Sequence, residues 1–156
     1  MRFGEVSVQS RASFDGAEHL KRLDVRFDKD LNGKCYVRLG LPSAKTAATG
    51  EIESVFLVEQ QGLCPLEALE NLARVVPAGL NDPLFSWMDR RGNIRPMVRD
   101  TALKKINSII MSCGWGTMFG HSFRIGSASF YLAQGVSPEI VRIAGRWKSL
   151  AFQAYI

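Results

Sequence analysis

The sequence lacks any long apolar run. No window approaches about 18 uninterrupted apolar residues, the length of a membrane-spanning helix, so a membrane span is excluded. The N-terminus has no basic stretch followed by an apolar segment, and secretion is therefore unsupported. Among the 156 residues 46% are apolar, which is enough for the core of one domain.

Cysteine is scarce and odd in number. Cys35, Cys64 and Cys113 lie far apart, which argues against a disulfide framework and against a zinc site. Three reduced thiols are typical of an intracellular protein, and the nucleus is the expected compartment if the source is eukaryotic.

Acidic residues are few in the C-terminal half. Residues 1–85 hold ten Lys/Arg against twelve Asp/Glu, whereas residues 86–156 hold ten against three. Such a basic excess is typical of a surface that meets a polyanion, most commonly nucleic acid. Charge alone leaves open a solvated basic face that has no partner.

A small antiparallel sheet is predicted near the N-terminus. Residues 22–29 alternate apolar and charged positions, Asn32-Gly33 is a strong hairpin signal, and residues 34–41 and 52–59 supply two further strands.

Helices are predicted to form the bulk of the chain. The expected helices cover residues 65–76, 100–113 (capped by Asp100), 121–134, 138–145 and a short final segment, 149–156, and a hairpin is expected at 84–98. Phe123, Phe130 and Tyr131 are expected in the core. We therefore predict one α+β domain over residues 1–156, mainly helical, with a three-stranded antiparallel sheet on one flank.

His121 and Arg124 stand three residues apart on a predicted helix and therefore share one face. A guanidinium grips phosphate oxygens with a planar fork, and an imidazole beside it can move a proton. Taken alone, this pair is also compatible with an ordinary surface pair.

The residues that follow make the pattern more specific. After His-Ser-Phe-Arg come an apolar helix, a turn, a second helix, Gly145-Arg146-Trp147 and, eight residues beyond Trp147, Tyr155. This order resembles the signature of tyrosine recombinases and phage-type integrases, and the ending is similar to recombinases of eukaryotic, especially fungal, mobile elements.

The other residues of that family's active site have counterparts in the chain. Arg2, followed three residues later by Glu5, matches the arginine expected near the start of the catalytic domain. Lys45 lies in the loop between the second and third predicted strands, where the family has a lysine.

The resemblance implies DNA strand cleavage and rejoining, as in site-specific recombination or DNA integration. Tyr155 would attack a phosphodiester to give a 3′-phosphotyrosine, with His121 as the base and Lys45 as the general acid. The remaining members would act on the phosphate or beside it: Arg2 and Arg124 would neutralise its charge, Trp147 would donate its indole N–H, and Glu5 would hold an arginine. The phosphotyrosine stores the bond energy, so neither ATP nor a metal is required.

Double-stranded DNA is the implied partner. Arg142, Arg146 and Lys148 flank the expected site and are predicted to contact the DNA backbone. Two alternatives remain: a helix-turn-helix module at 121–147 that binds DNA without chemistry, and a decayed or domesticated recombinase. Against the first, the helix at 138–144 offers mostly apolar residues and is expected in the core.

Relative to the resembled family, the chain begins at the first catalytic arginine and stops one residue after the tyrosine. The family's N-terminal DNA-clamping domain and its C-terminal segment would thus be missing, and the full-length parent would self-associate on DNA. We expect residues 1–156 alone to be inactive or very weak.

Overall fold

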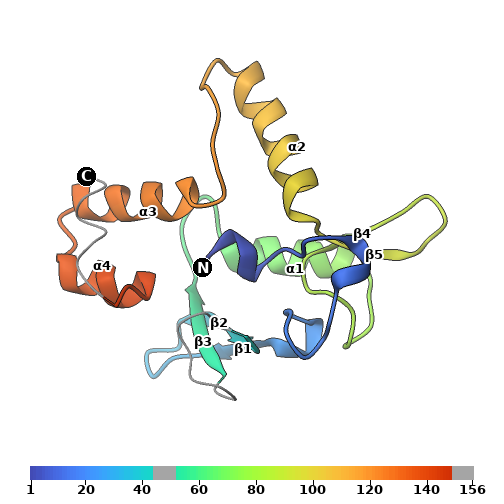
Figure 1. Cartoon of the computed structure of the whole chain (residues 1–156). Coiled ribbons are helices and arrows are strands. Elements are labelled where there is room, and N and C mark those ends of the chain that lie inside the picture. Colours follow the sequence, from blue (N-terminus) through green and yellow to red (C-terminus); the bar gives the residue numbers. More distant parts are fainter. Residues whose placement is uncertain (44–51, 149–156) are drawn as a thin grey trace. The chain divides into compact units, whose positions relative to one another are not determined.

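The computed structural model describes residues 1–43 and 52–148 (Figure 1). Contacts divide the chain into two compact units. The sheet unit is Glu5–Arg99, and the helical unit combines Met1–Gly4 with the chain from Asp100 onwards. The described residues form four α-helices and two antiparallel sheets, so the predicted α+β class is confirmed. None of these helices has the length and apolar character needed to cross a bilayer.

The larger sheet of the sheet unit has the predicted topology (Figure 1). Its strands are β1 (Val25–Lys29), β2 (Cys35–Leu41) and β3 (Glu53–Val58), antiparallel in the order β1-β2-β3. The β1–β2 turn forms because the Asp30 Oδ1 atom accepts the N–H groups of Asn32 and Lys34 at 2.8 and 2.9 Å. Gly33 follows with a φ of 76°, which favours glycine.

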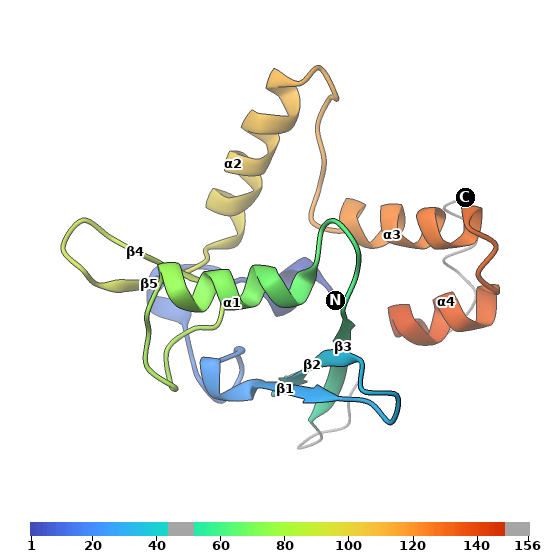
Figure 2. The same cartoon turned by 180° about the vertical axis from the view of Figure 1, so that it is seen from behind.

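One face of this sheet supplies the main core. Val37, Leu39 and Leu41 alternate along β2 and are fully buried. Helix α1 (Pro65–Val75) contacts β3 (Figure 2) and buries Leu66 and Leu69. The 65–76 prediction was therefore correct to within one residue.

The first strand is shorter than predicted. Residues 22–24 form a 3-10 turn, η3, in which the Asp24 Oδ2 atom accepts the Lys21 N–H at 2.8 Å. Leu23 and Phe27 are half exposed. The prediction that the strand begins at residue 22 was therefore wrong. The hydrogen bond from the Lys21 N–H to the Asp24 carboxylate stabilises a turn there and competes with the extended conformation.

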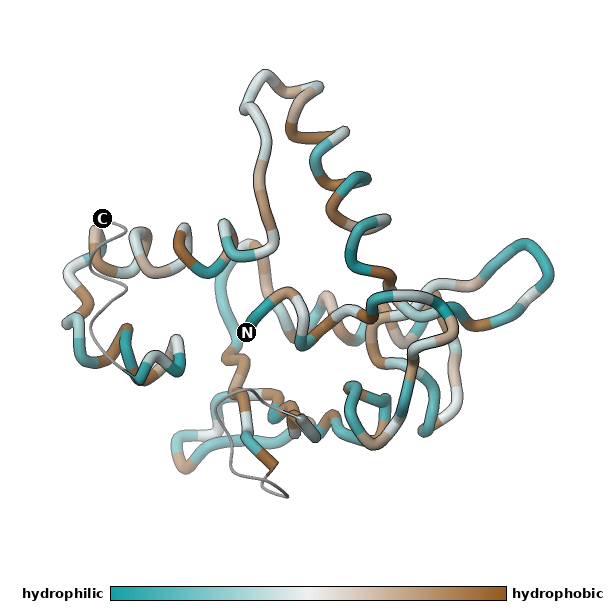
Figure 3. Tube along the Cα trace, viewed as in Figure 1, coloured by the Kyte–Doolittle hydropathy of each residue, from teal (hydrophilic) through white to brown (hydrophobic). Residues whose placement is uncertain are grey.

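The expected hairpin at 84–98 is present as β4 (Ser86–Met88) and β5 (Ile94–Pro96). Its connecting turn is hydrophilic (Figure 3). The Asp89 carboxylate organises this turn: Oδ1 accepts the Arg91 and Asn93 backbone N–H groups at 2.9 Å each, and Oδ2 accepts Nε–H of Arg95 at 2.9 Å.

The helical unit contains α3 (Ser122–Ala133), α4 (Pro138–Gly145) and, except for its first residue, α2 (Arg99–Ser112), all close to the predicted ranges. Ser137 caps α4, as expected, by accepting the Ile140 N–H. Asp100 does not cap α2, because the helix already begins at Arg99 and the carboxylate lies in its first turn. The final helix expected at 149–156 lies outside the described residues.

The core of the helical unit is small. Ala128 of α3 meets Val141 of α4, and Leu132, Val136 and Trp147 pack around them. The prediction that Phe123, Phe130 and Tyr131 are core residues was wrong, since all three are exposed. Helical spacing alone did not reveal that α3 turns its small Ala128, and not its aromatic residues, toward α4.

Candidate functional site

The helical unit carries the whole net charge of the chain. Its sequence holds seven Lys/Arg against two Asp/Glu, whereas the sheet unit holds thirteen of each. The net charge of +5 thus falls on about two fifths of the residues, in the same unit that contains most of the predicted site. Such a concentration of positive charge attracts anions through its long-range field.

His121 and Arg124 lie at the start of α3. His121 is the N-cap residue, and its carbonyl accepts the N–H groups of Arg124 and Ile125 at 3.1 and 3.0 Å. The His121 side chain is exposed, whereas Arg124 is partly buried. The helix start therefore presents an accessible imidazole one turn away from a sheltered guanidinium.

Arg124 is held between the helix and the segment that follows α4. Its Cζ atom lies 4.1 Å from the centre of the Trp147 ring, within the range of a cation–π contact. One Nη2–H also donates to the Arg146 carbonyl at 3.3 Å. The ring and the carbonyl together restrain the position of the Arg124 guanidinium.

Gly145 makes this stack possible. A Cβ at position 145 would lie 1.5 Å from Cζ3 of Trp147, so only glycine leaves room for the indole. The helix then ends with Arg146 in the left-handed region, at φ 55° and ψ 45°. Glycine normally takes the left-handed position at a helix end. Here Gly145 provides space for the Trp147 ring, and Arg146 adopts the left-handed backbone conformation, which costs more for a residue with a side chain.

Residue 2 belongs to the same unit as α3. The ring of its neighbour Phe3 stacks on Phe123, with centroids 5.8 Å apart and planes 11° from parallel. Arg2 is partly buried, and the Nη1 atoms of Arg2 and Arg124 are both shielded from solvent. The stacked rings thus join the segment with the first predicted arginine to the helix with the second.

Arg142, Arg146 and Lys148 differ in their surroundings. The Arg142 guanidinium binds both carboxylate oxygens of Glu139 and donates to the Trp147 carbonyl at 3.1 Å. This pairing raises the pKa of Arg142 and lowers that of Glu139. Lys148 is exposed and Arg146 partly buried. Arg142 thus has a structural role in holding Trp147, and DNA contact by these three residues stays a prediction.

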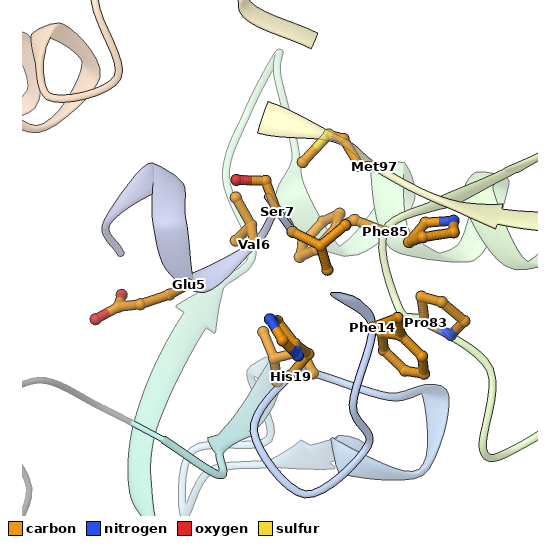
Figure 4. A pocket seen from close by; sticks show the side chains of 11 residues that line it. Glu5, Val6, Ser7, Phe14, His19, Pro83, Phe85 and Met97 are labelled. Carbon is orange, nitrogen blue, oxygen red and sulfur yellow. The ribbon is translucent and has the colours of Figure 1, made fainter. Parts of the chain in front are cut away.

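Lys45 and Tyr155 lie outside the described residues. Glu5 falls in the sheet unit, and its carboxylate points away from the small cavity lined by Phe14, Phe85 and Met97 (Figure 4). That cavity has a volume of about 10 Å³, which holds at most one water molecule.

Sequence reasoning missed the stacking contacts. It identified Arg124 and Trp147 separately, but not that the ring face of Trp147 supports Arg124 or that Phe3 packs on Phe123. The Gly-x-Trp spacing and the phenylalanines beside Arg2 and Arg124 were the available signals.

In comparisons with known proteins, no family model matches the chain. No curated protein matches it either.

Proposed function

We propose that this chain is the catalytic part of a tyrosine recombinase, which cleaves and rejoins DNA strands through a 3′-phosphotyrosine. The observation that carries the proposal is the Phe3–Phe123 stack, which joins the segment of Arg2 to the helix of His121 and Arg124. Two cationic groups from opposite ends of the sequence thereby belong to one basic, compact unit.

The chemistry of these groups fits a phosphodiester in its transition state. Negative charge grows on the phosphate oxygens as the phosphorus becomes five-coordinate, and fixed guanidinium donors stabilise that charge most when they do not have to reorganise. The Trp147 ring and the Arg146 carbonyl limit the movement of Arg124. Arg124 therefore meets the requirement for a preorganised donor.

In the proposed cleavage step, the Tyr155 oxygen attacks phosphorus and the bond from phosphorus to the 5′ oxygen breaks. His121 accepts the phenol proton, and Lys45 gives a proton to the departing 5′ oxygen. Rejoining runs the same steps in reverse with a new 5′ hydroxyl, so the number of phosphodiester bonds is unchanged and no external energy source enters.

The test is capture of a covalent adduct. The protein is incubated with a DNA duplex that is nicked just downstream of the scissile phosphate, so that the short fragment carrying the 5′ hydroxyl diffuses away and the phosphotyrosine persists. We expect an adduct on denaturing gels that Tyr155→Phe abolishes. Arg124→Ala should slow its formation by about 10²–10³-fold, the usual effect of losing one transition-state donor.

Arg74→Ala is the matched control, because Arg74 is an exposed arginine on α1 of the sheet unit. It should form adduct at the rate of the unmodified protein. An adduct that survives in Tyr155→Phe would remove the nucleophile assignment. DNA binding without any adduct would favour a module that binds but does not cleave.

The helix-turn-helix alternative remains weak, although one argument against it was wrong. Helix α4 was expected in the core, but only Val141 of its residues is buried, and Ile140 and Ile143 are exposed. Base reading requires polar side chains on the recognition helix. The exposed surface of α4 is mainly apolar, and its Glu139 is paired with Arg142, so this helix is poorly suited to read base edges.

A further inference from the structure

The outer face of the sheet β1-β2-β3 carries two directly opposed arginines. Arg26 of β1 faces Arg38 of β2 across the ladder, and both are exposed. Opposed residues in an antiparallel pair have Cβ atoms about 4.5–5.5 Å apart, and like charges there destabilise the sheet. No ion pair neutralises either arginine among the residues that the structure describes. An anion that binds both would relieve this repulsion.

Aromatic rings lie beside the arginines on the same face. Phe56 of β3 is opposite Arg38, and Tyr36 lies two residues before Arg38 on β2. The two rings are 5.8 Å apart and tilted by 57°. Phe56 is 59% exposed, an unusual state for a phenylalanine in the middle of a strand. These rings offer an accessible apolar platform next to positive charge.

A shallow hollow of about 630 Å³ begins at this platform. Tyr36, Phe56 and Val58 form its apolar side, and Lys34 and Gln61 add hydrogen-bonding groups. Two carboxylates, Asp30 and Glu59, also line it, and Asp28 accepts the Tyr36 hydroxyl at 3.4 Å. The volume lies within the range of about 300–1,000 Å³ that is typical of small-ligand sites. The acidic groups disfavour a phosphate in the hollow, whereas a neutral ring would fit there.

The spacing of the two features matches one nucleotide. Residues two apart on one face of a strand are separated by about 6.8 Å, the distance between the Arg38 and Tyr36 positions. A base on the aromatic platform would place its own phosphate near the arginine pair. Unpaired bases expose the faces that aromatic side chains stack on, whereas duplex DNA hides them.

We propose that the outer face of β1-β2-β3 binds a single-stranded polynucleotide, with a base on Tyr36 and Phe56 and a phosphate on Arg26 and Arg38. The site lies wholly in the sheet unit, so it does not depend on the proposed recombinase chemistry of the helical unit.

The test measures binding of fluorescein-labelled oligothymidine to the full chain by fluorescence anisotropy, beside an abasic oligomer of equal length and a duplex. We expect oligothymidine to bind about tenfold or more tightly than the abasic oligomer, given the usual contribution of one stacked base. Phe56→Leu should remove that difference. The joint change Arg26→Gln and Arg38→Gln should weaken oligothymidine binding by about tenfold.

Each variant has a matched control. Phe130→Leu alters a phenylalanine of the same 59% exposure on α3, and Arg90→Gln with Arg91→Gln removes two exposed charges from the β4–β5 turn. Both should bind oligothymidine within about twofold of the unmodified chain, since exposed charges away from a site act weakly. Thermal melts verify that every variant is folded.

Equal affinity for the thymidine and abasic oligomers, or equal losses in the variants and their controls, would overturn the proposal. So would a duplex that binds as tightly as the single strand. Tyr155→Phe should leave oligothymidine binding unchanged. Oligothymidine binding can therefore be observed when adduct formation fails, and an adduct can form when oligothymidine does not bind.

Discussion

At the scale of single residues, the Arg124–Trp147 stack depends on a glycine that contacts no ligand. Gly145→Ala would drive a methyl group into the indole, so Trp147 must move and Arg124 loses its platform. We expect the free energy of unfolding of the helical unit to fall by about 1–3 kcal/mol, the usual cost of overpacking. Urea unfolding followed by Trp147 fluorescence, with Trp87 and Trp115 changed to Phe, measures this.

Gly126→Ala is the control at the same scale. Gly126 lies inside α3, and a Cβ there would meet nothing within 4 Å. Alanine should therefore stabilise the helix by about 0.5–1 kcal/mol through its better helix propensity. If both substitutions shift the unfolding midpoint equally, the contact between Gly145 and the indole has no special role.

The sequence indicates candidate site residues, but it does not indicate their contacts. His121 and Arg124 share a helix start because residues three apart always do, and Ser137 and Pro138 give a helix start by local chemistry. The Phe3–Phe123 stack joins residues 120 positions apart, and no local pattern encodes such a pairing. Which ring packs on which arginine depends on the tertiary structure.

At the scale of elements, the β4–β5 hairpin depends on one ionised carboxylate. Hydrogen bonds from Asn93, and then from Arg95 and Arg91, lower the pKa of Asp89 to about 2 from the usual 3.8. A carboxyl whose folded pKa is lowered contributes stability that is complete above its unfolded pKa and is lost as the pH falls through the folded one. The hairpin should therefore loosen between about pH 4 and pH 2.

Amide hydrogen exchange at Asn93 and Arg91, measured across that pH range and corrected for intrinsic rates, checks this expectation. Asp89→Asn should open the hairpin already at pH 7 and remove the dependence on pH, because an amide has no charge to lose. Protection in the unmodified chain that stays constant down to pH 2 would contradict the assigned role.

Element boundaries were predictable wherever a local signal marks them. The sequence indicated several ends of strands and helices correctly, and a local signal lies at or beside each of them: the Asp30–Gly33 turn, Pro65, Gly135 and Ser137. Burial was less predictable, because the same helical periodicity fits the buried Leu66 and Leu69 of α1 and the exposed Phe123 and Phe130 of α3. Periodicity defines a face, and only tertiary contacts decide whether that face is covered.

At the scale of the whole molecule, the two units differ sharply in their cores. In the described chain, the fully buried large side chains Val37, Leu39, Leu41 and Leu84 all belong to the sheet unit, and the buried apolar side chains of the helical unit are the smaller Ala128 and Val141. Burial of apolar surface is the main favourable term in folding. The helical unit should therefore open more readily than the sheet unit.

Native-state hydrogen exchange on the full chain tests this difference. Amides of β2 should exchange only through the largest opening, whereas those of α3 and α4 should exchange through smaller, local ones. A nicked DNA duplex should then protect α3 and α4 selectively, since a ligand stabilises the state that it binds and the basic excess lies in this unit. Equal protection of both units without DNA would contradict the predicted difference in stability. A gain from DNA confined to the sheet unit would contradict a DNA site in the helical unit.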